Sequence, residues 1–179
     1  EGVPSFPTRR AAVEHCEEEL LRRYGAHLPV RSAVAVEESV ALASLAPEDV
    51  AALVARMESR AYDDGVTVRR VGQRFGGVYF IVSGRINSYA SGPAGDRIKL
   101  STLSAGMTFG ELSLGSEDRQ EITEKADGPV EVRVLTAAAI ALLEQEDPGL
   151  ATKLWRALTR DAYTRVDQYL REAALHVRD

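Results

Sequence analysis

The sequence predicts an α+β fold in which a small antiparallel β-roll is flanked by helices at both ends. Between residues 59 and 135, short apolar runs rich in β-branched and aromatic residues are bounded by glycines at near-even spacing. Such runs are typical of short strands joined by tight turns. Residues 8–24 and 136–178 instead carry apolar residues at helical spacing. We therefore expect the roll at the centre of the domain, with helices before and after it.

The first predicted helix covers residues 8–24, with Thr8 as its N-cap and Gly25 as its end. Cys16 lies on this helix, where we expect it to be a small buried hydrophobic residue. After a connector, a second helix is predicted to start either at Ser44 or at the Ala46-Pro47 step, because proline suits the first helical turn.

The last strand of the predicted roll covers residues 130–134, where valines alternate strictly with charged residues. A helix capped by Thr136 follows, and the sequence Asp-Pro-Gly at 147–149 interrupts it. A final helix is predicted from about Leu150 to His176.

Composition argues against several classes of function. The net charge of −5 argues against a nucleic-acid partner, which requires a basic face. No apolar run reaches the ~20 residues that span a bilayer, and no signal segment is visible, so we expect a cytoplasmic location without membrane insertion. The three histidines lack metal-ligand spacing and no nucleophile motif is present, so we expect no metal and no catalysis. The chain opens on Glu1, and we expect it to be part of a longer protein.

Three segments in order, DGVTVRRVG, GVYFIVSGRI and GMTFGELSL, resemble the cyclic nucleotide-binding domain family over about residues 45–170. The resemblance depends on the spacings Gly65 to Gly72, Gly72 to Tyr79 and Tyr79 to Gly84. It implies an eight-stranded antiparallel β-roll of the double-stranded β-helix or jelly-roll type. It also implies a final helix that packs on the roll, covers the nucleotide pocket or pairs with its twin in a dimer.

The resemblance further implies a phosphate-binding cassette that begins at Phe109. In it, Glu111 would accept the ribose 2′-hydroxyl, because a carboxylate is a strong acceptor. Backbone N–H groups at the start of a short helix would face the phosphate. The implied ligand-binding residues are Phe109, Gly110, Glu111, Leu112, Ser113, Arg119, Gln120 and Glu121.

The second half of this cassette departs from the family pattern. The family places an arginine nine residues after Glu111, and this count ends on Gln120, one residue past Arg119. If the loop is one residue shorter, Arg119 is the phosphate ligand, while Gln120 and Glu121 replace two small residues. If the loop keeps its length, Gln120 replaces the arginine, and the position of Ala126 favours this register.

Residues 111–125 contain five acids and two bases, a net charge of −3 that repels an anionic ligand. We therefore expect a non-catalytic regulatory or assembly module in which cyclic AMP binds weakly or not at all. The alternative is a functional cyclic AMP or cyclic GMP sensor that moves its C-terminal helix on binding.

The final helix carries an apolar stripe that predicts either packing on the roll or a homodimer seam, and we expect the homodimer. Its second half comprises Tyr163, Val166, Leu170, Ala173 and Val177, which step by three and four residues.

The segment AAVEHCEEELL near the N-terminus is similar to the closing helix of STAS domains. We therefore expect residues 1–43 to be the end of a STAS-like segment with a connector, followed by a cyclic nucleotide-binding-like domain at 44–179. Within that domain the roll should cover about 59–135 and the C-terminal helices 136–178. The combination occurs in bacterial glutaminases and in sulfate-permease-like proteins, so the resemblance implies that the remainder of such a parent chain is a partner.

Overall fold

The computed structural model describes residues 33–92, 97–115 and 120–176, together with seven residues of the N-terminal segment. The chain divides into two compact units, residues 1–31 and 32–179. In the first unit the seven described residues are all helical, in agreement with the predicted helix, while Thr8 and Gly25 lie outside the described residues. The prediction for Cys16 was wrong, because its side chain is exposed rather than buried.

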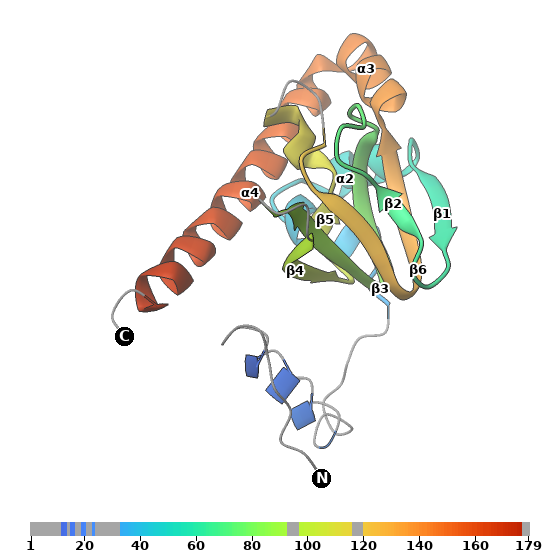
Figure 1. The fold of residues 1–179 in the computed structure, drawn as a ribbon. Helices are drawn as coiled ribbons and strands as arrows, with labels where there is room; N and C mark the ends of the chain where they lie inside the picture. Colours follow the sequence, from blue (N-terminus) through green and yellow to red (C-terminus); the bar gives the residue numbers. More distant parts are fainter. Residues whose placement is uncertain are drawn as a thin grey trace. The chain divides into compact units, whose positions relative to one another are not determined.

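The second unit begins with short helices, continues as a sheet and ends with two α-helices (Figure 1). Its elements are η2 (Val36–Glu38), η3 (Val40–Leu42), α2 (Pro47–Val54), β1 (Glu58–Tyr62), β2 (Thr67–Arg69), β3 (Gly77–Ser91), β4 (Arg97–Ser104), β5 (Thr108–Phe109), η4 (Glu111–Gly115), β6 (Thr123–Thr136), α3 (Ala137–Glu146) and α4 (Pro148–His176). The predicted antiparallel sheet with flanking helices is confirmed.

The described residues form six strands rather than the eight that were expected. The sheet order is β1-β6-β3-β4, with β2 on β6 and β5 on β3, and all pairs are antiparallel. The count is lower because β3 and β6 are 15 and 14 residues long and remain paired where two shorter strands were expected.

Bulges allow β3 to bend without ending. Its register with β6 shifts between Ile81 and Ser83 and again between Ser83 and Arg85. Gly84 lies at this second shift with a φ of 82°, and a Cβ there would meet the carbonyl oxygen of Pro129 at 2.2 Å. Only glycine fits such a conformation at such a close approach of two strands.

The ends of the helices follow the sequence closely. Helix α2 starts after Ala46 with Pro47 in its first turn, which decides between the two predicted starts. The predicted N-cap of α3 is confirmed, because Thr136 Oγ1 accepts a hydrogen bond from the Ala139 N–H at 3.2 Å. Helix α4 begins at Pro148, two residues before its predicted start.

Alternation along β3 divides the core into two clusters. Val78 and Phe80 pack with the helices, together with Leu53, Leu143 and Leu154. Tyr79 and Ile81 point to the other face of the sheet and pack with Phe109, Val130, Val132 and Val134, so the predicted common face of these valines is confirmed.

The apolar stripe of α4 has two different halves. Leu150, Leu154 and Leu158 are almost fully buried against the domain. Tyr163 and Leu170 are 72% and 65% exposed, and α4 extends beyond the sheet at its C-terminal end (Figure 1). The first half of the stripe therefore anchors the helix, and these two side chains of the second half remain accessible.

Candidate functional site

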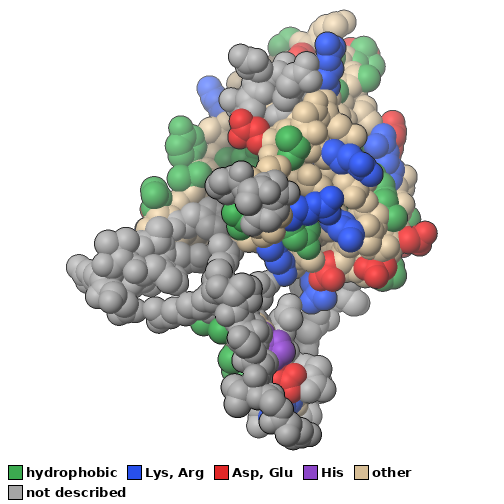
Figure 2. All heavy atoms as spheres, in the orientation of Figure 1, with side chains coloured by type: hydrophobic (Ala, Val, Ile, Leu, Met, Phe, Trp, Pro, Cys, Tyr) green, Lys and Arg blue, Asp and Glu red, His purple; other side chains and the backbone are tan. Residues whose placement is uncertain are grey.

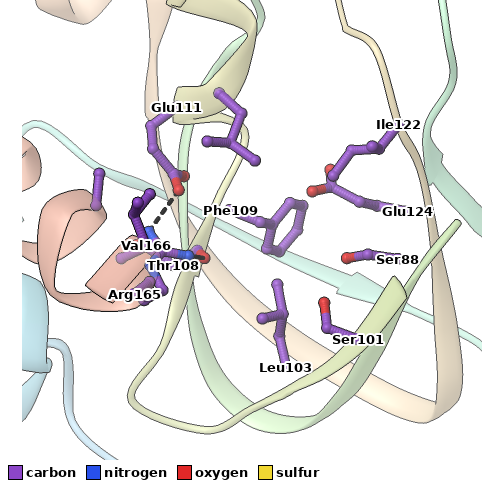
Figure 3. A pocket seen from close by; sticks show the side chains of 12 residues that line it. Ser88, Ser101, Leu103, Thr108, Phe109, Glu111, Ile122, Glu124, Arg165 and Val166 are labelled. Carbon is purple, nitrogen blue, oxygen red and sulfur yellow. Dashed lines mark hydrogen bonds and ion pairs between the residues drawn. The ribbon is translucent and has the colours of Figure 1, made fainter. Parts of the chain in front are cut away.

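A cavity of about 110 Å³ lies between the sheet, the short helix η4 and the middle of α4 (Figure 3). Its apolar lining comes from Leu103, Phe109, Leu112, Ile122, Ala162 and Val166. Its polar lining comes from Ser88, Ser101, Thr108, Glu111, Glu124 and Arg165. An apolar cavity with a few convergent polar groups is the usual form of a small-molecule site.

The turn after β5 positions the first predicted site residues. Phe109 pairs with Tyr79 of β3, and the two rings stack with centroids 4.7 Å apart. Gly110 follows with a φ of 94°, and a Cβ at this position would lie 2.6 Å from the Gly77 carbonyl oxygen. The glycine therefore turns the chain sharply enough for Glu111 to enter the cavity.

Glu111 is buried and forms an ion pair with a residue of the last helix. Its Oε1 lies 2.5 Å from Nη2 of Arg165, while its Oε2 is buried without a partner among the described residues. The Arg165 guanidinium also contacts Asp161 Oδ2 at 2.8 Å and donates to the Thr108 carbonyl oxygen at 3.2 Å. The sequence did not predict this contact, which ties α4 to the cassette.

Leu112 and Ser113 follow in η4. The Leu112 side chain lines the cavity yet is 56% exposed. Ser113 is buried, and its hydroxyl donates to the Gly110 carbonyl oxygen at 2.7 Å. The serine side chain thus stabilises the turn rather than lining the cavity.

The second half of the cassette is described from Gln120 onwards, and Arg119 lies outside the described residues. Gln120 is 2% exposed, and its Nε2 donates to Glu124 Oε2 at 3.2 Å. The Gln120 carbonyl oxygen accepts a hydrogen bond from the Gly72 N–H at 2.7 Å, and the Gln120 N–H donates to the Gln73 carbonyl oxygen at 2.8 Å. The glutamine at the position where an arginine was expected therefore forms a hydrogen bond with a glutamate.

Glu121 is exposed and does not line the cavity, whereas Glu124 is 1% exposed and does line it. Glu124 lies opposite Ser88 of β3 and Arg69 of β2. Burial, with the nearby charge of Glu111, raises the pKa of Glu124 from 4.5 to about 8, although Arg69 and Arg165 oppose the shift. This carboxyl group is therefore mostly protonated at pH 7.

Sequence reasoning did not single out Glu124, although a signal was present. The inward valines at 130, 132 and 134 share their parity with Ala126 and Glu124. Extending the alternation of β6 backwards would have directed Glu124 to the interior. Arg165 gave no such signal, because its place depends on how α4 crosses the sheet.

Residues 59–147 match the model of the cyclic nucleotide-binding domain family. This segment, which includes the sheet and most of the cavity lining, is therefore a domain of the cyclic nucleotide-binding type. The resemblance read from the glycine spacing is confirmed at this level.

Two curated relatives are glutaminases of Bradyrhizobium diazoefficiens. Glutaminase 2 is 29% identical over 148 residues, which cover 82% of this chain and 23% of that protein. Glutaminase 1 is 29% identical over 118 residues, which cover 66% of this chain and 19% of that protein. The chain therefore spans less than a quarter of the length of these relatives.

Solved structures share the fold at low sequence identity. The N-terminal domain of a transcriptional regulator from Streptomyces coelicolor A3(2) has a TM-score of 0.63 at 24% identity, and covers 75% of this chain and 96% of its own. A cyclic nucleotide-binding domain from Methylobacillus flagellatus has a TM-score of 0.63 at 21% identity, and covers 76% and 83%.

Two further kinds of feature are absent from the described part of the chain. It contains no group of three or more His, Cys, Asp or Glu side chains arranged to hold a metal ion. No described helix is long and apolar enough to cross a membrane.

Proposed function

We propose that this domain is a non-catalytic regulatory or assembly module that retains the cyclic nucleotide-binding fold but binds cyclic AMP weakly or not at all. The observation that carries the proposal is the Gln120–Glu124 pair on the β6 side of the cavity. In the register favoured by Ala126, the family resemblance calls for an arginine at position 120. The neutral glutamine found there donates a hydrogen bond to the carboxyl group of Glu124 instead.

The energetic consequence of this exchange is large. Arginine offers a phosphate a two-pronged charged donor, whereas glutamine offers only a neutral amide. A hydrogen bond to a charged group contributes about 1.5–3 kcal/mol net. The loss of one such bond lowers affinity by about tenfold to a hundredfold, and an ionised Glu124 would add repulsion.

The Glu111–Arg165 ion pair also disfavours a nucleotide. By resemblance, Glu111 is the acceptor for the ribose hydroxyl, and its Oε1 is already bound by Arg165. A nucleotide would have to share this carboxylate with the guanidinium or displace it. Displacement would be costly, because the Arg165 side chain is only 18% exposed and its guanidinium would lose the Glu111 carboxylate.

One observation favours the alternative of a cyclic nucleotide sensor. The first half of the cassette is formed, with Gly110 in its turn and Glu111 Oε2 still able to accept a hydrogen bond. Because Arg165 joins this residue to α4, a ligand that displaced the arginine would release the middle of the helix.

The wider setting is also a proposal. The two glutaminase relatives support a larger bacterial enzyme as the parent, with the remainder of that chain as the domain's partner. We place residues 1–43 at the end of a STAS-like segment, the protein in the cytoplasm and a homodimer contact on α4. No nucleic-acid partner is proposed, and on the face shown in Figure 2 basic and acidic side chains lie close to one another.

Isothermal titration calorimetry of the whole chain with cyclic AMP and cyclic GMP tests the proposal. We expect no binding, or a dissociation constant well above the low micromolar range. A low micromolar or tighter constant for either nucleotide would overturn the proposal in favour of the sensor.

A double substitution tests the physical reason. Gln120→Arg together with Glu124→Val supplies the missing guanidinium and removes the buried acid. Cyclic AMP affinity should rise at least about tenfold, because a charged donor is worth about 1.5–3 kcal/mol. An unchanged titration, with the circular dichroism of the wild-type protein retained, would mean that the Gln120–Glu124 pair is not what limits binding.

A further inference from the structure

We propose that the cavity binds a small organic cation, a guanidinium or alkylammonium group on a short apolar body, through Glu111 and Glu124. The inference deepens the proposed function by naming the ligand class of the same cavity. It rests on that function, because the residues that disfavour a cyclic phosphate are those that favour a cation.

Two carboxyl groups, Glu111 and Glu124, contribute to the polar lining of the cavity beside three hydroxyl groups and Arg165. Glu111 is 7% exposed, and its Oε2 has no partner among the described residues although it is fully buried. Glu124 is 1% exposed, and Ser88, its cross-strand neighbour, adds a hydroxyl to the same wall. A buried acceptor without a partner is costly, so a ligand that brings N–H donors compensates a deficit already present in the protein.

Arg165 shows that a guanidinium suits this environment. Its Nη2 binds Glu111 Oε1 and Asp161, and its Nη1 donates to the Thr108 carbonyl oxygen. The Arg165 side chain carries the same guanidinium group as the proposed ligand. It leaves Glu111 Oε2 available to a second donor. A ligand can therefore donate to the same carboxylate without first displacing Arg165 and, with it, α4.

The shape of the cavity sets the size of the ligand. Its volume of about 110 Å³ lies well below the ~300–1,000 Å³ of sites for drug-sized molecules. In Figure 3 the Phe109 ring lies between Glu111 and Glu124, with Leu103 close to it. A cation here would contact the aromatic ring between the two carboxyl groups, a favourable arrangement for ammonium and guanidinium groups.

The charged groups around the cavity can accommodate one more cation, because Glu124 can ionise when the cation binds. Glu111 of η4 and Asp161 of α4 are balanced by Arg165 of α4 and Arg69 of β2, and Glu124 of β6 is mostly protonated at pH 7. A bound cation favours the ionised form of Glu124, whose pKa of about 8 should fall on binding. Binding at pH 7 should therefore release a proton, whereas a bound anion would not cause this release.

The test is a calorimetric titration of the whole chain with methylguanidinium chloride, using N-methylurea as its neutral isostere. In phosphate and HEPES buffers at pH 7 we expect a dissociation constant of about 1 mM or tighter. We also expect at least half a proton released per site and at least tenfold weaker binding of N-methylurea. No methylguanidinium binding at 10 mM, or equal binding of the two compounds, would overturn the inference.

Two matched variants locate the site. Glu124→Gln imitates the protonated acid, so it should weaken methylguanidinium binding at least tenfold and abolish the proton release. Glu131→Gln removes an exposed acid from the same strand and should leave both quantities unchanged. Equal behaviour of the two variants would overturn the role of Glu124 and with it the inference.

A third variant addresses Arg165. Arg165→Ala frees Glu111 Oε1 and enlarges the cavity, so methylguanidinium should bind at least as tightly as to the wild type. Binding seen only in this variant would overturn the inference, because the helix's own guanidinium would then fill the site. The cyclic AMP titration is independent of these results: tight cyclic AMP binding contradicts the proposed function, and absent methylguanidinium binding contradicts only this inference.

Discussion

Glu124 carries a carboxyl group that is almost fully buried on the cavity side of the sheet. A buried carboxyl group favours its protonated form, and the pKa of about 8 is well above the ordinary 4.5. The folded protein therefore holds this proton more tightly than the unfolded chain does. The stabilisation that follows is fully present below about pH 4.5 and is lost as the pH rises towards 8.

This linkage makes a prediction for Glu124→Gln. The variant cannot ionise, so its free energy of unfolding should exceed that of the wild type by about 2–4 kcal/mol at pH 8.5, with little difference at pH 4.5. Urea denaturation of both proteins at several pH values measures the difference. A difference that does not change between pH 4.5 and pH 8.5 would contradict the burial of an ionisable group at this position.

At the scale of elements, the contact between α4 and the cassette depends on one arginine. Arg165 and Arg171 both form i,i+4 ion pairs with aspartates on the same helix, Asp161 and Asp167. Only Arg165 also reaches Glu111, and its side chain is 18% exposed against 78% for Arg171. The two arginines therefore form a matched pair for experiment.

Arg165→Ala should lower the free energy of unfolding by about 2–4 kcal/mol, because it leaves the Glu111 carboxylate buried without its cation. Arg171→Ala should change the same quantity by less than about 1 kcal/mol, as is usual for exposed ion pairs. Urea denaturation at pH 7 measures both. Hydrogen exchange should also quicken in the C-terminal half of α4 for the Arg165 variant alone. Similar losses in the two variants would mean that α4 is not anchored at the cassette.

The elements themselves were largely predictable. Thr136 and Pro47 marked helix starts correctly, because capping and the first helical turn are local matters of chemistry. The strand count was wrong because the apolar runs bounded by glycines were expected to be separate short strands, whereas Gly84 lies in a bulge that leaves β3 continuous. Whether a glycine ends a strand or bends it depends on the partner strand, which sequence alone does not show.

The candidate site was predictable only in its first half. Phe109 to Glu111 follow a local pattern, and the structure brings them to the cavity. Glu124 and Arg165 come from β6 and α4, and they meet Glu111 only through tertiary packing. The predicted charge repulsion was assigned to the five acids of residues 111–125 together, and of these Glu111 and Glu124 line the cavity whereas Glu121 does not.

At the scale of the whole molecule, the exposed half of α4 supports the expected homodimer. Leu170→Asp should convert a dimer into a monomer, because burying a leucine is worth about 1.5–3 kcal/mol and a two-fold contact contains it twice. Sedimentation equilibrium at tens of micromolar measures the mass. Since Leu170 is 65% exposed, the melting temperature of the domain itself should not fall. A wild-type protein that sediments as a monomer would remove the dimer from the proposal.

The pairing of β6 with three other strands has a consequence for biosynthesis. Glu58 of β1 pairs with Val134, and β2 and β3 also pair with β6. During translation β1, β2 and β3 are therefore complete before their shared partner β6 is made, and only the pairings of β3 with β4 and β5 can form beforehand. Until residues 123–136 leave the ribosome, the nascent domain carries unpaired strand edges of the kind that recruit other chains. The synthesis of the last strand, rather than the first, thus ends the period in which this domain is prone to aggregation.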